Sequence, residues 1–580
     1  MFKKILALII CVLVLSLILV GCNKADRENI SEPDSLATES EQEATVNDGK
    51  LRIFSNGEYN CRIIRPENST PREREFYIAL RSMLKQVTGV NPPISTDFKN
   101  HDEQYDENEF AILVGHTKYE ESSELYSKLT YSDFRAELID KKYAIAFHDF
   151  DTATSALESL KKLFTKNYKN GEIILDESWS FSYSEDELLK SIPIYDGGVF
   201  SDVHEGAYEM QTVVIQNTDK NEYNAYLTSL SAHGFSPYTD NSIGKNLFAT
   251  YTSDKYILNA MFFDAKSEVR ITMEYTGNYS LPALEDENIY TPTDVECSVT
   301  QIGLEESTGK QNGMSYVFKL ADGSFFIIDG GMANAKDQFM EVITSLADDP
   351  ENITVASWLI THAHGDHFGL LYSVLYDKEC LDVLNIEQII WSKVSEKQLS
   401  NIDGGNMDYI DKMFNALEDT KIVIAHPGQV FYIRNATYTV YATIELVEPF
   451  ALTNLNDSSI VGRLVIDGKS LFFPGDSHPT ETDVLTSLYF NDMKSDVVQV
   501  IHHGYQGGNA SFYSSVDPLT VFWPLGMKNY EIGGTDSTPM KTWSYSAWLF
   551  SEESKVQKIY VAGSDVTTLL ISELPSHANS

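Results

Sequence analysis

The sequence predicts an α/β protein that is divided into several domains. At 580 residues the chain is too long for one compact domain. Apolar, β-branched runs alternate with amphipathic helical segments through most of its length. With 42% hydrophobic and 12% aromatic residues, the composition is that of a globular protein with large cores. We expect two small α/β domains, followed by a larger α/β domain in the C-terminal half.

The N-terminus carries a short basic stretch, an apolar run and a cysteine. Two lysines precede the apolar segment at residues 5–20, and Gly21 stands before Cys22. These are the parts of a secretory signal. The Leu-Val-Gly-Cys ending resembles a bacterial lipobox, which implies a signal peptide at residues 1–22 and lipidation at Cys22. The alternative is a plain anchoring helix, since the apolar run is near the lower limit for spanning a bilayer.

The segment after this cysteine predicts a tether. Residues 23–49 are rich in Glu, Ser, Asp and Asn and show no apolar period. Such a segment cannot bury enough apolar surface to fold, so we expect it to be flexible. The lipid would then hold the folded domains on the extracytoplasmic face of the cell membrane, in an exterior of the Gram-positive type.

The net charge restricts the partners. A net charge of −41 repels polyanions, so nucleic acid is a disfavoured partner. We expect a small-molecule or cell-envelope substrate, and the sequence leaves the oligomeric state open. The cysteines that follow the tether, Cys61, Cys297 and Cys380, are odd in number and far apart, so they predict buried small hydrophobic side chains and no disulfide framework.

Residues 50–187 predict a small α/β domain. Its second helix carries apolar residues from 156 to 164, and we expect Asp151 to be the N-cap of that helix. The run at 112–117 resembles part of the small domain that precedes the catalytic barrel in some glycoside hydrolases. The expected strands are 51–54, 61–64, 110–115 and 143–148, and the first expected helix is 72–87.

Residues 205–285 predict a second small α/β domain. A helix at 222–230 lies between strand-like runs, and the Pro-, Thr- and acid-rich stretch at 282–294 predicts a linker. Neither small domain contains a catalytic constellation, so we expect both to position substrate or dock to the cell wall. The expected strands of the second are 210–215, 257–263 and 269–275.

The residues that carry chemistry follow a predicted buried strand at 353–360. Residues 361–369 read Thr-His-Ala-His-Gly-Asp-His-Phe-Gly. Imidazole and carboxylate groups are the ligands that zinc and similar divalent cations accept. A surface histidine patch is the alternative reading. The metal-binding candidates in this motif are His362, His364, Asp366 and His367.

The His-x-His-x-Asp-His motif resembles the signature of the metallo-β-lactamase-fold hydrolases. Three further segments match that family in its order: an early strand and Asp-Gly-Gly turn at 325–331, a strand ending in Gly-Asp at 471–476, and a strand ending in His-His-Gly at 497–504. The resemblance covers about residues 295–575. It implies a four-layer αβ/βα sandwich in the C-terminal half of the chain.

The resemblance also implies ligand roles. His362 and His364 would hold one metal ion, Asp366 and His367 a second, and Asp476 would bridge the two. Zinc is the expected metal, with two ions, although manganese or iron is compatible. Two ions about 3.5–4 Å apart lower the pKa of a bridging water and supply hydroxide at neutral pH. Asp366 would therefore be both a ligand and a catalytic residue.

The last ligand comes from His502 or His503. Strand alternation would point the two side chains to opposite sides. The resemblance favours His503 as the ligand, because it stands beside Gly504, where the family places its own. His502 is then a candidate for proton transfer in catalysis. Asp329 would orient a ligand histidine through the other ring nitrogen.

The sequence departs from the family pattern at one position. Many members carry a further histidine shortly before the strand that leads to Gly-Asp, where this chain has Leu-Asn-Asp-Ser-Ser at 455–459. His426 stands far ahead of that point, so we expect Asn456, Asp457 or water to complete the first metal site. With His-His-Gly as its last motif, the chain most resembles the subgroup of the exterior domain of bacterial DNA-uptake channels and of phosphorylcholine esterases.

Three functions are compatible with these residues. The first is a surface-anchored hydrolase that cleaves a phosphoester or phosphodiester with metal-activated water. The second is a lactonase, amidase or β-lactamase-like carbonyl hydrolase, for which Arg463 and Lys528 are candidate carboxylate-binding residues. The third is a binding lipoprotein with a degenerate metal site, which the missing histidine favours slightly.

Overall fold

The computed structural model describes most of the chain beyond the expected tether. Cys22 and the predicted signal peptide and tether lie outside the described residues. Within the described part, no helix combines the length and the hydrophobicity needed to cross a membrane. The described residues are 50–577, except for 70, 99–109, 177–178, 278, 303–312, 396–409, 411–412, 416, 418, 448–453, 533–537 and 564–565.

The first small module, at residues 50–187, contains two sheets. The four-stranded sheet has the order β2 (Glu58–Tyr59), β1 (Lys50–Ser55), β9 (Glu172–Asp176), β8 (Tyr168–Lys169). The six-stranded sheet has the order β10 (Ser180–Ser184), β6 (Asp133–Ile139), β7 (Lys142–Phe147), β5 (Ala111–Val114), β3 (Arg62–Arg65), β4 (Ile94–Thr96). The expected strands and helices are present. The helices are α2 (Pro71–Thr88), α3 (Glu120–Tyr126) and α4 (Phe150–Asn167).

The N-cap predicted for α4 is wrong by two positions. Asp149 is the N-cap, and its carboxylate accepts hydrogen bonds from the backbone amides of Asp151 and Thr152. Asp151 lies in the first turn, where its negative charge faces the positive end of the helix dipole. Both aspartates favour a helix start, and the sequence alone did not distinguish the cap from the first turn.

The second small module, which begins after α5 (Glu187–Ser191), is one antiparallel sheet with a helix on one face. The helix α6 (Lys220–Ser229) starts in a capping box made by Asp219 and Glu222. Tyr223 and Tyr226 on this helix are buried against the sheet. The strand order is β11 (Val199–Glu205), β12 (Gln211–Gln216), β16 (Glu268–Tyr275), β15 (Tyr256–Phe263), β14 (Asn246–Thr252), β13 (Ser236–Ile243).

Two larger sheets form the C-terminal domain. The first has the order β23 (Lys421–Ile424), β22 (Gln388–Trp391), β20 (Ile353–Leu359), β19 (Phe325–Ile328), β18 (Tyr316–Lys319), β17 (Ser298–Gln301), β31 (Thr567–Leu570), and β21 (Leu384–Ile386) pairs with β20. The second has the order β24 (Val430–Ile433), β25 (Ala436–Ala442), β26 (Val461–Ile466), β27 (Lys469–Phe473), β28 (Val497–Gln499), β29 (Thr520–Trp523), β30 (Lys558–Val561).

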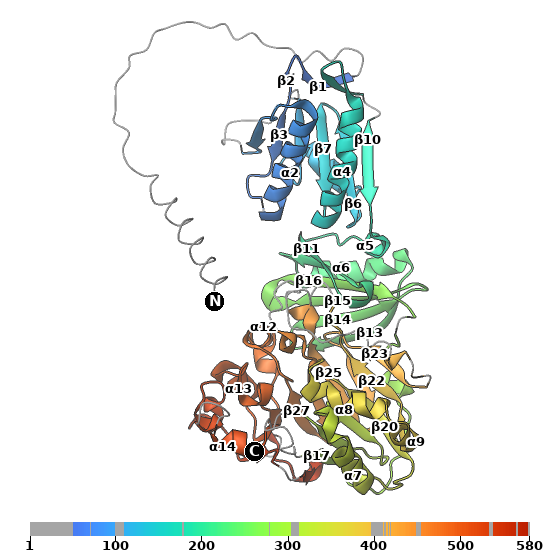
Figure 1. The fold of residues 1–580 in the computed structure, drawn as a ribbon, viewed down its shortest axis with the longest axis vertical. Coiled ribbons are helices and arrows are strands. Elements are labelled where there is room, and N and C mark those ends of the chain that lie inside the picture. The colour runs from blue at the N-terminus through green and yellow to red at the C-terminus, as the bar shows by residue number, and fades with distance from the viewer. Residues whose placement is uncertain are drawn as a thin grey trace, which may run out of the picture. The chain divides into compact units, whose positions relative to one another are not determined.

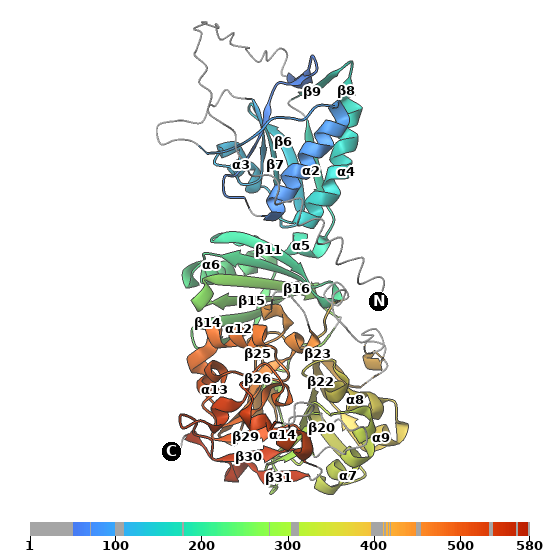
Figure 2. The same cartoon turned by 60° about the vertical axis from the view of Figure 1, so that its left-hand side comes forward.

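These sheets pack face to face between two layers of helices, as Figures 1 and 2 show. Side chains such as Phe318, Phe473 and Phe522 fill the space between the sheets. The predicted four-layer αβ/βα sandwich is therefore confirmed. The outer helices are α7 (Lys336–Leu346), α8 (Gly365–Leu375) and α9 (Lys378–Val383) beside the first sheet, and α12 (Pro479–Tyr489), α13 (Ala510–Val516) and α14 (Met527–Ile532) beside the second.

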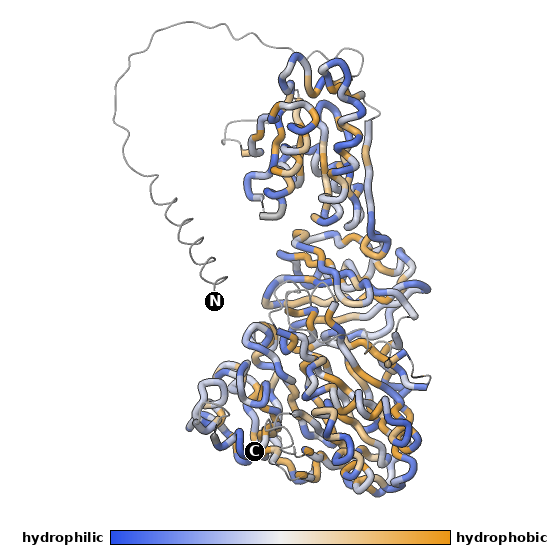
Figure 3. The backbone as a smooth tube through the Cα atoms, viewed as in Figure 1, coloured by the Kyte–Doolittle hydropathy of each residue, from blue (hydrophilic) through white to orange (hydrophobic). Residues whose placement is uncertain are grey.

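The strands at the centre of both sheets are rich in apolar residues, and orange, hydrophobic stretches run through this domain in Figure 3. Every residue of β19 and of β27 except Ser470 is buried. This follows from the sandwich, because a strand covered on both faces cannot place polar residues on alternate positions. The predicted buried cysteines agree, since Cys61, Cys297 and Cys380 are all buried and free.

A buried charged cluster joins the second module to the C-terminal domain. His426 Nδ1 lies 2.8 Å from a carboxylate oxygen of Glu445, and its Nε2 lies 3.3 Å from Glu274 of β16. Thr272 and Arg270 of the same strand also bind Glu445, through its carboxylate and its backbone carbonyl. Burial alone would lower the pKa of His426, but the two glutamates raise it to about 10.

We predict that His426→Gln destabilises the protein by about 3–5 kcal/mol at pH 6, because it leaves buried glutamates without a counter-charge. A histidine with a raised pKa stabilises the fold fully below its unfolded pKa of about 6.5. This contribution is lost as the pH rises toward the folded value of about 10. The difference in Tm between wild type and variant should therefore shrink from pH 6 to pH 10.

Thermal unfolding of the full chain at a series of pH values measures this difference. The matched control is His233→Gln, because His233 is exposed at the end of a short helical turn in the second module. A loss of stability that is the same at pH 6 and pH 9 would mean that His426 acts by packing and carries no charge.

Candidate metal centre

Four strand ends supply the site. Asp329 follows β19, the 361–367 segment follows β20, Asp476 follows β27 and the 501–504 turn follows β28. Within each sheet the two strands concerned are parallel neighbours, so their carboxyl ends lie at the same edge. Residues that are far apart in sequence therefore meet where the two sheets face each other.

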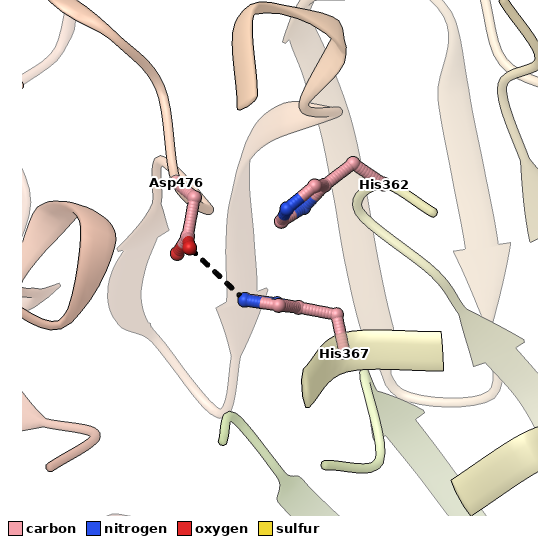
Figure 4. Close-up of side chains that lie close together, drawn as sticks. All are labelled: His362, His367 and Asp476. Carbon is pink, nitrogen blue, oxygen red and sulfur yellow. Dashed lines mark ion pairs between the residues drawn. The ribbon is translucent and has the colours of Figure 1, made fainter. Parts of the chain in front are cut away.

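The histidine-rich motif changes from loop to helix as it passes through the site. His362 is fully buried at the end of β20, and His364 is the N-cap of α8. Asp366 and His367 lie in the first turn of that helix. Figure 4 shows His362 and His367 directed toward Asp476 on the opposite sheet.

The ligand atoms lie close enough to share cations. His367 Nε2 is 3.1 Å from Asp476 Oδ2, and His503 Nε2 is 3.4 Å from the same oxygen. His503 Nε2 is also 3.5 Å from Asp366 Oδ2. Two groups each place their ligand atoms within 4.8 Å of one another: His362, His367 and Asp476, and Asp366, His367 and His503.

In His367 and His503, an acceptor oxygen fixes the Nδ1 atom, which leaves the Nε2 atom for a metal. His503 Nδ1 donates to the carbonyl oxygen of Pro524 at 2.6 Å, and His367 Nδ1 lies 2.7 Å from Asp329 Oδ2. The Nε2 atoms of both rings are buried and form no hydrogen bond. A carbonyl can only accept, so a neutral His503 has its lone pair on Nε2. These residues fit a bound divalent cation.

Asp329 organises the inner wall of the site. It is fully buried, and its carboxylate accepts hydrogen bonds from the backbone amide of Thr361 at 2.7 Å and from the Thr361 hydroxyl at 2.8 Å. Its backbone is left-handed, with φ of +54°, a conformation that aspartate tolerates better than most residues. The structure thus places Asp329 behind His367, where it can orient the imidazole.

The electrostatics of the site stabilise positive charge. Burial alone would lower the pKa of His367, but Asp476 and Asp329 raise it well above the usual value. Burial would likewise lower the pKa of His503, yet Asp476 and Asp366 raise it to about 10. Burial alone would raise the pKa of Asp476, but His367 and His503 hold it well below the usual range. The carboxylates thus remain ionised beside the imidazoles, as metal ligands must.

The turn that contains His502 and His503 is not an extension of the strand, so the strand-alternation argument is wrong. β28 ends at Gln499, and the two histidines have left-handed backbones with φ of +48° and +54°. Gly504 follows with φ of +90°, and a Cβ there would lie 2.6 Å from the Trp523 ring. Such conformations cost about 1–3 kcal/mol each and are concentrated at functional sites.

The two histidines of this turn have different surroundings. His503 is buried, whereas His502 is 18% exposed, with its Nε2 3.8 Å from Asp476 Oδ2 and 3.2 Å from Asn456 Nδ2. Burial lowers the pKa of His502 to about 4. The structure brings His503 into the group with Asp366 and His367, and places His502 at the edge of the site.

The segment with the missing histidine lies at the site, and His426 does not. Asn456 is buried with its Oδ1 free of hydrogen bonds, and its amide group faces His502. Asp457 is also buried, and burial raises the pKa of its carboxyl. His426 is bound to Glu274 and Glu445 instead.

One side of the site is open to solvent. His364, Asp366 and His502 are only partly buried, whereas His362, His367 and His503 are enclosed. Aromatic rings lie next to His503. The ring centre of Tyr505 is 6.4 Å from that of His503 and 6.1 Å from that of Trp543. The site is therefore accessible on the side of Asp366 and His502.

Three supporting residues were missed in the sequence. Thr361 binds Asp329 and lies 3.1 Å from His362 Nδ1, and its place directly before the motif was the available signal. Ser459 accepts a hydrogen bond from the Asp476 amide through its hydroxyl. Pro524 acts only through its backbone carbonyl, which no sequence pattern reveals.

Comparisons with known proteins bear on the C-terminal domain. The family model of the metallo-beta-lactamase superfamily matches residues 308–522. No curated protein matches the chain. Among solved structures, the metallo-beta-lactamase fold protein YhfI from Bacillus subtilis is 13% identical, with 47% of this chain and 100% of that one covered and a TM-score of 0.29.

Two other solved structures share a similar part of the chain. CmlA, a diiron beta-hydroxylase from Streptomyces venezuelae, is 14% identical, with 48% of this chain and 55% of that one covered and a TM-score of 0.32. A B3 metallo-beta-lactamase with an active-site glutamic acid is 14% identical, with 41% of this chain and 91% of that one covered and a TM-score of 0.24. With the matched family model and the four-layer sandwich, the C-terminal part of this chain is a metallo-β-lactamase superfamily domain.

Proposed function

We propose that this protein is a metal-dependent hydrolase that acts on a phosphoester or phosphodiester at the cell surface. The observation that carries the proposal is the convergence of buried, hydrogen-bond-free Nε2 atoms of His367 and His503 on Asp476 and Asp366. Zinc held there, expected as two ions, would supply Lewis acidity and an activated water at neutral pH. Manganese or iron would suit the same donor set.

The chain's own residues then have separate tasks. Asp476 joins the two groups of ligands, since it lies against His367 and His503 and beside His502. Asp329 holds the His367 ring by its outer nitrogen. His502 is neutral at pH 7, because burial lowers its pKa to about 4, and it stands on the open side. It is placed to accept a hydrogen bond from, or pass a proton to, a group on the substrate.

The proposed substrate class follows from the donor set and the N-terminus. Charged phosphoryl oxygens suit a site that stabilises charge with two cations. Lipidation at Cys22 would place this site at the cell envelope, where phosphodiester polymers and phosphocholine groups occur. The charge of −41 argues against nucleic acid as the substrate.

The carbonyl-hydrolase alternative has less support. Arg463, one of its two candidate carboxylate-binding residues, donates to the backbone carbonyl of Asp492 and faces the ring of Tyr441. Its guanidinium is therefore used in part by contacts to β25 and to the turn after α12. Lys528 lies on α14 and remains the other candidate.

We predict that the wild-type protein hydrolyses bis-p-nitrophenyl phosphate and that Asp366→Ala lowers kcat/KM by more than about 100-fold, because loss of a ligand exceeds the usual effect of losing an outer-shell partner. The matched control is Asp382→Ala on α9, an exposed aspartate of the same domain. Release of p-nitrophenol measures the rate. Hydrolysis of lactones or β-lactams alone would favour the carbonyl hydrolase. Bound metal without turnover of any of these substrates would favour a binding protein.

We predict that the purified protein contains about two zinc ions per chain and that prolonged chelation removes both the metal and the activity. Because the ligands come from both sheets, metal removal should also lower Tm. Elemental analysis and thermal unfolding before and after chelation measure these effects, and added zinc should restore both. An unchanged metal-free activity would contradict the proposal.

We predict that Asp329→Asn weakens zinc binding by about 10–100-fold, since an amide orients the His367 ring less strongly than a carboxylate does. Competition with a chromogenic chelator gives the affinity, and added zinc in excess should rescue part of the activity. A variant that loses activity but binds zinc as tightly as wild type would show that Asp329 has no role in holding the metal.

A further inference from the structure

A cavity separate from the metal centre lies where the sheet of the second module meets the C-terminal domain. Its volume is about 250 Å³, and strands β13, β14 and β15 supply one wall. The opposite wall comes from the 427–432 segment, with Pro282, Leu284 and Glu285 at its edge. The two walls are joined by direct contact, since Asn241 Nδ2 donates to the carbonyl oxygen of Gly428 at 2.9 Å.

Asn259, one of the residues that line this cavity, has an unused hydrogen-bond donor. The residue is 3% exposed, and its Oδ1 accepts a hydrogen bond from the Thr250 hydroxyl at 2.8 Å. That bond fixes the amide, and the Nδ2 group has no hydrogen-bond partner. A buried donor without a partner costs about 1–3 kcal/mol, so a ligand oxygen that accepts from it is strongly favoured.

The other lining residues restrict the ligand's charge. None of the described residues that line the cavity is a lysine, arginine or histidine, so an anion finds no counter-charge there. Asp240 and Glu285 are both exposed, which leaves the deep end without negative charge. The free amide group of Asn259 is a donor, which disfavours a cation beside it. The lining of the cavity therefore favours a neutral ligand.

The remaining contacts favour a ring with hydroxyl groups. Phe248 and Met261 are buried apolar residues of the sheet, and Tyr432 is half-buried on the facing wall. An apolar ring face can pack against these side chains while a hydroxyl reaches the exposed Glu285. The volume is below the roughly 300–1,000 Å³ of pockets for drug-sized ligands, so it suits a single ring.

We propose that this cavity is a binding site for a neutral, hydroxylated ring of the size of one monosaccharide. A ligand oxygen accepts the hydrogen bond from Asn259 Nδ2, and a ligand hydroxyl donates to Glu285 at the rim. The site would allow the second module to hold a sugar unit apart from the metal centre of the C-terminal domain. It does not depend on the proposed hydrolase activity.

Titration calorimetry and saturation-transfer NMR on the full chain test this, with glucose and N-acetylglucosamine as neutral probes and choline and inorganic phosphate as charged ones. We expect at least one sugar to bind, and Asn259→Ala to weaken its binding about tenfold, the effect of one lost buried hydrogen bond. The matched control, Asn224→Ala on the exposed face of α6, should bind as wild type does. Asp366→Ala should also retain sugar binding, which separates this site from the metal centre.

A second variant keeps the test valid if Asn259→Ala lowers the stability. Glu285 is exposed, so Glu285→Ala should fold normally and still weaken sugar binding several-fold. The proposal is overturned if neither sugar binds at millimolar concentration, if only choline or phosphate binds, or if both variants bind sugar as the wild type does. A crystal structure grown with the bound sugar that shows only water at Asn259 Nδ2 would also overturn it.

Discussion

The buried line of polar contacts from Asp329 through His367 to Asp476 is the interaction on which the rest of the C-terminal domain depends. It crosses from the end of β19, through the first turn of α8, to the end of β27 on the opposite sheet. All three groups are buried, so each is stable only because the next one carries a compatible charge or proton. These contacts between the two sheets therefore determine where the candidate metal centre lies and which of its groups are charged.

Much of this arrangement was predictable from local sequence. The apolar runs at 325–328, 353–360 and 471–473 read as strands because burial on both faces removes polar alternation. The histidine motif could be predicted to bind a metal because four possible ligands stand within six residues after such a strand: His362, His364, Asp366 and His367. The family resemblance then supplied the pairing of this motif with Asp476 and the 502–503 pair, which no local pattern contains.

What the sequence did not reveal depends on backbone geometry and on contacts between distant segments. The left-handed turn at His502 and His503 has no local signature apart from the following glycine, so a regular strand was the natural but wrong expectation. His426 could not be assigned, because its partners Glu274 and Glu445 come from two different modules. The unused amide of Asn259 is likewise visible only once the facing wall is in place.

The split origin of the ligands has a consequence for biogenesis. Asp366 and His367 follow a strand of the first sheet and Asp476 and His503 follow strands of the second, and both sheets are completed only near the end of the described chain. A nascent polypeptide thus has no complete set of candidate ligands until both sheets are present. Under the proposed function, binding of the cation would be coupled to the ordering of both sheets and would be a late step of folding.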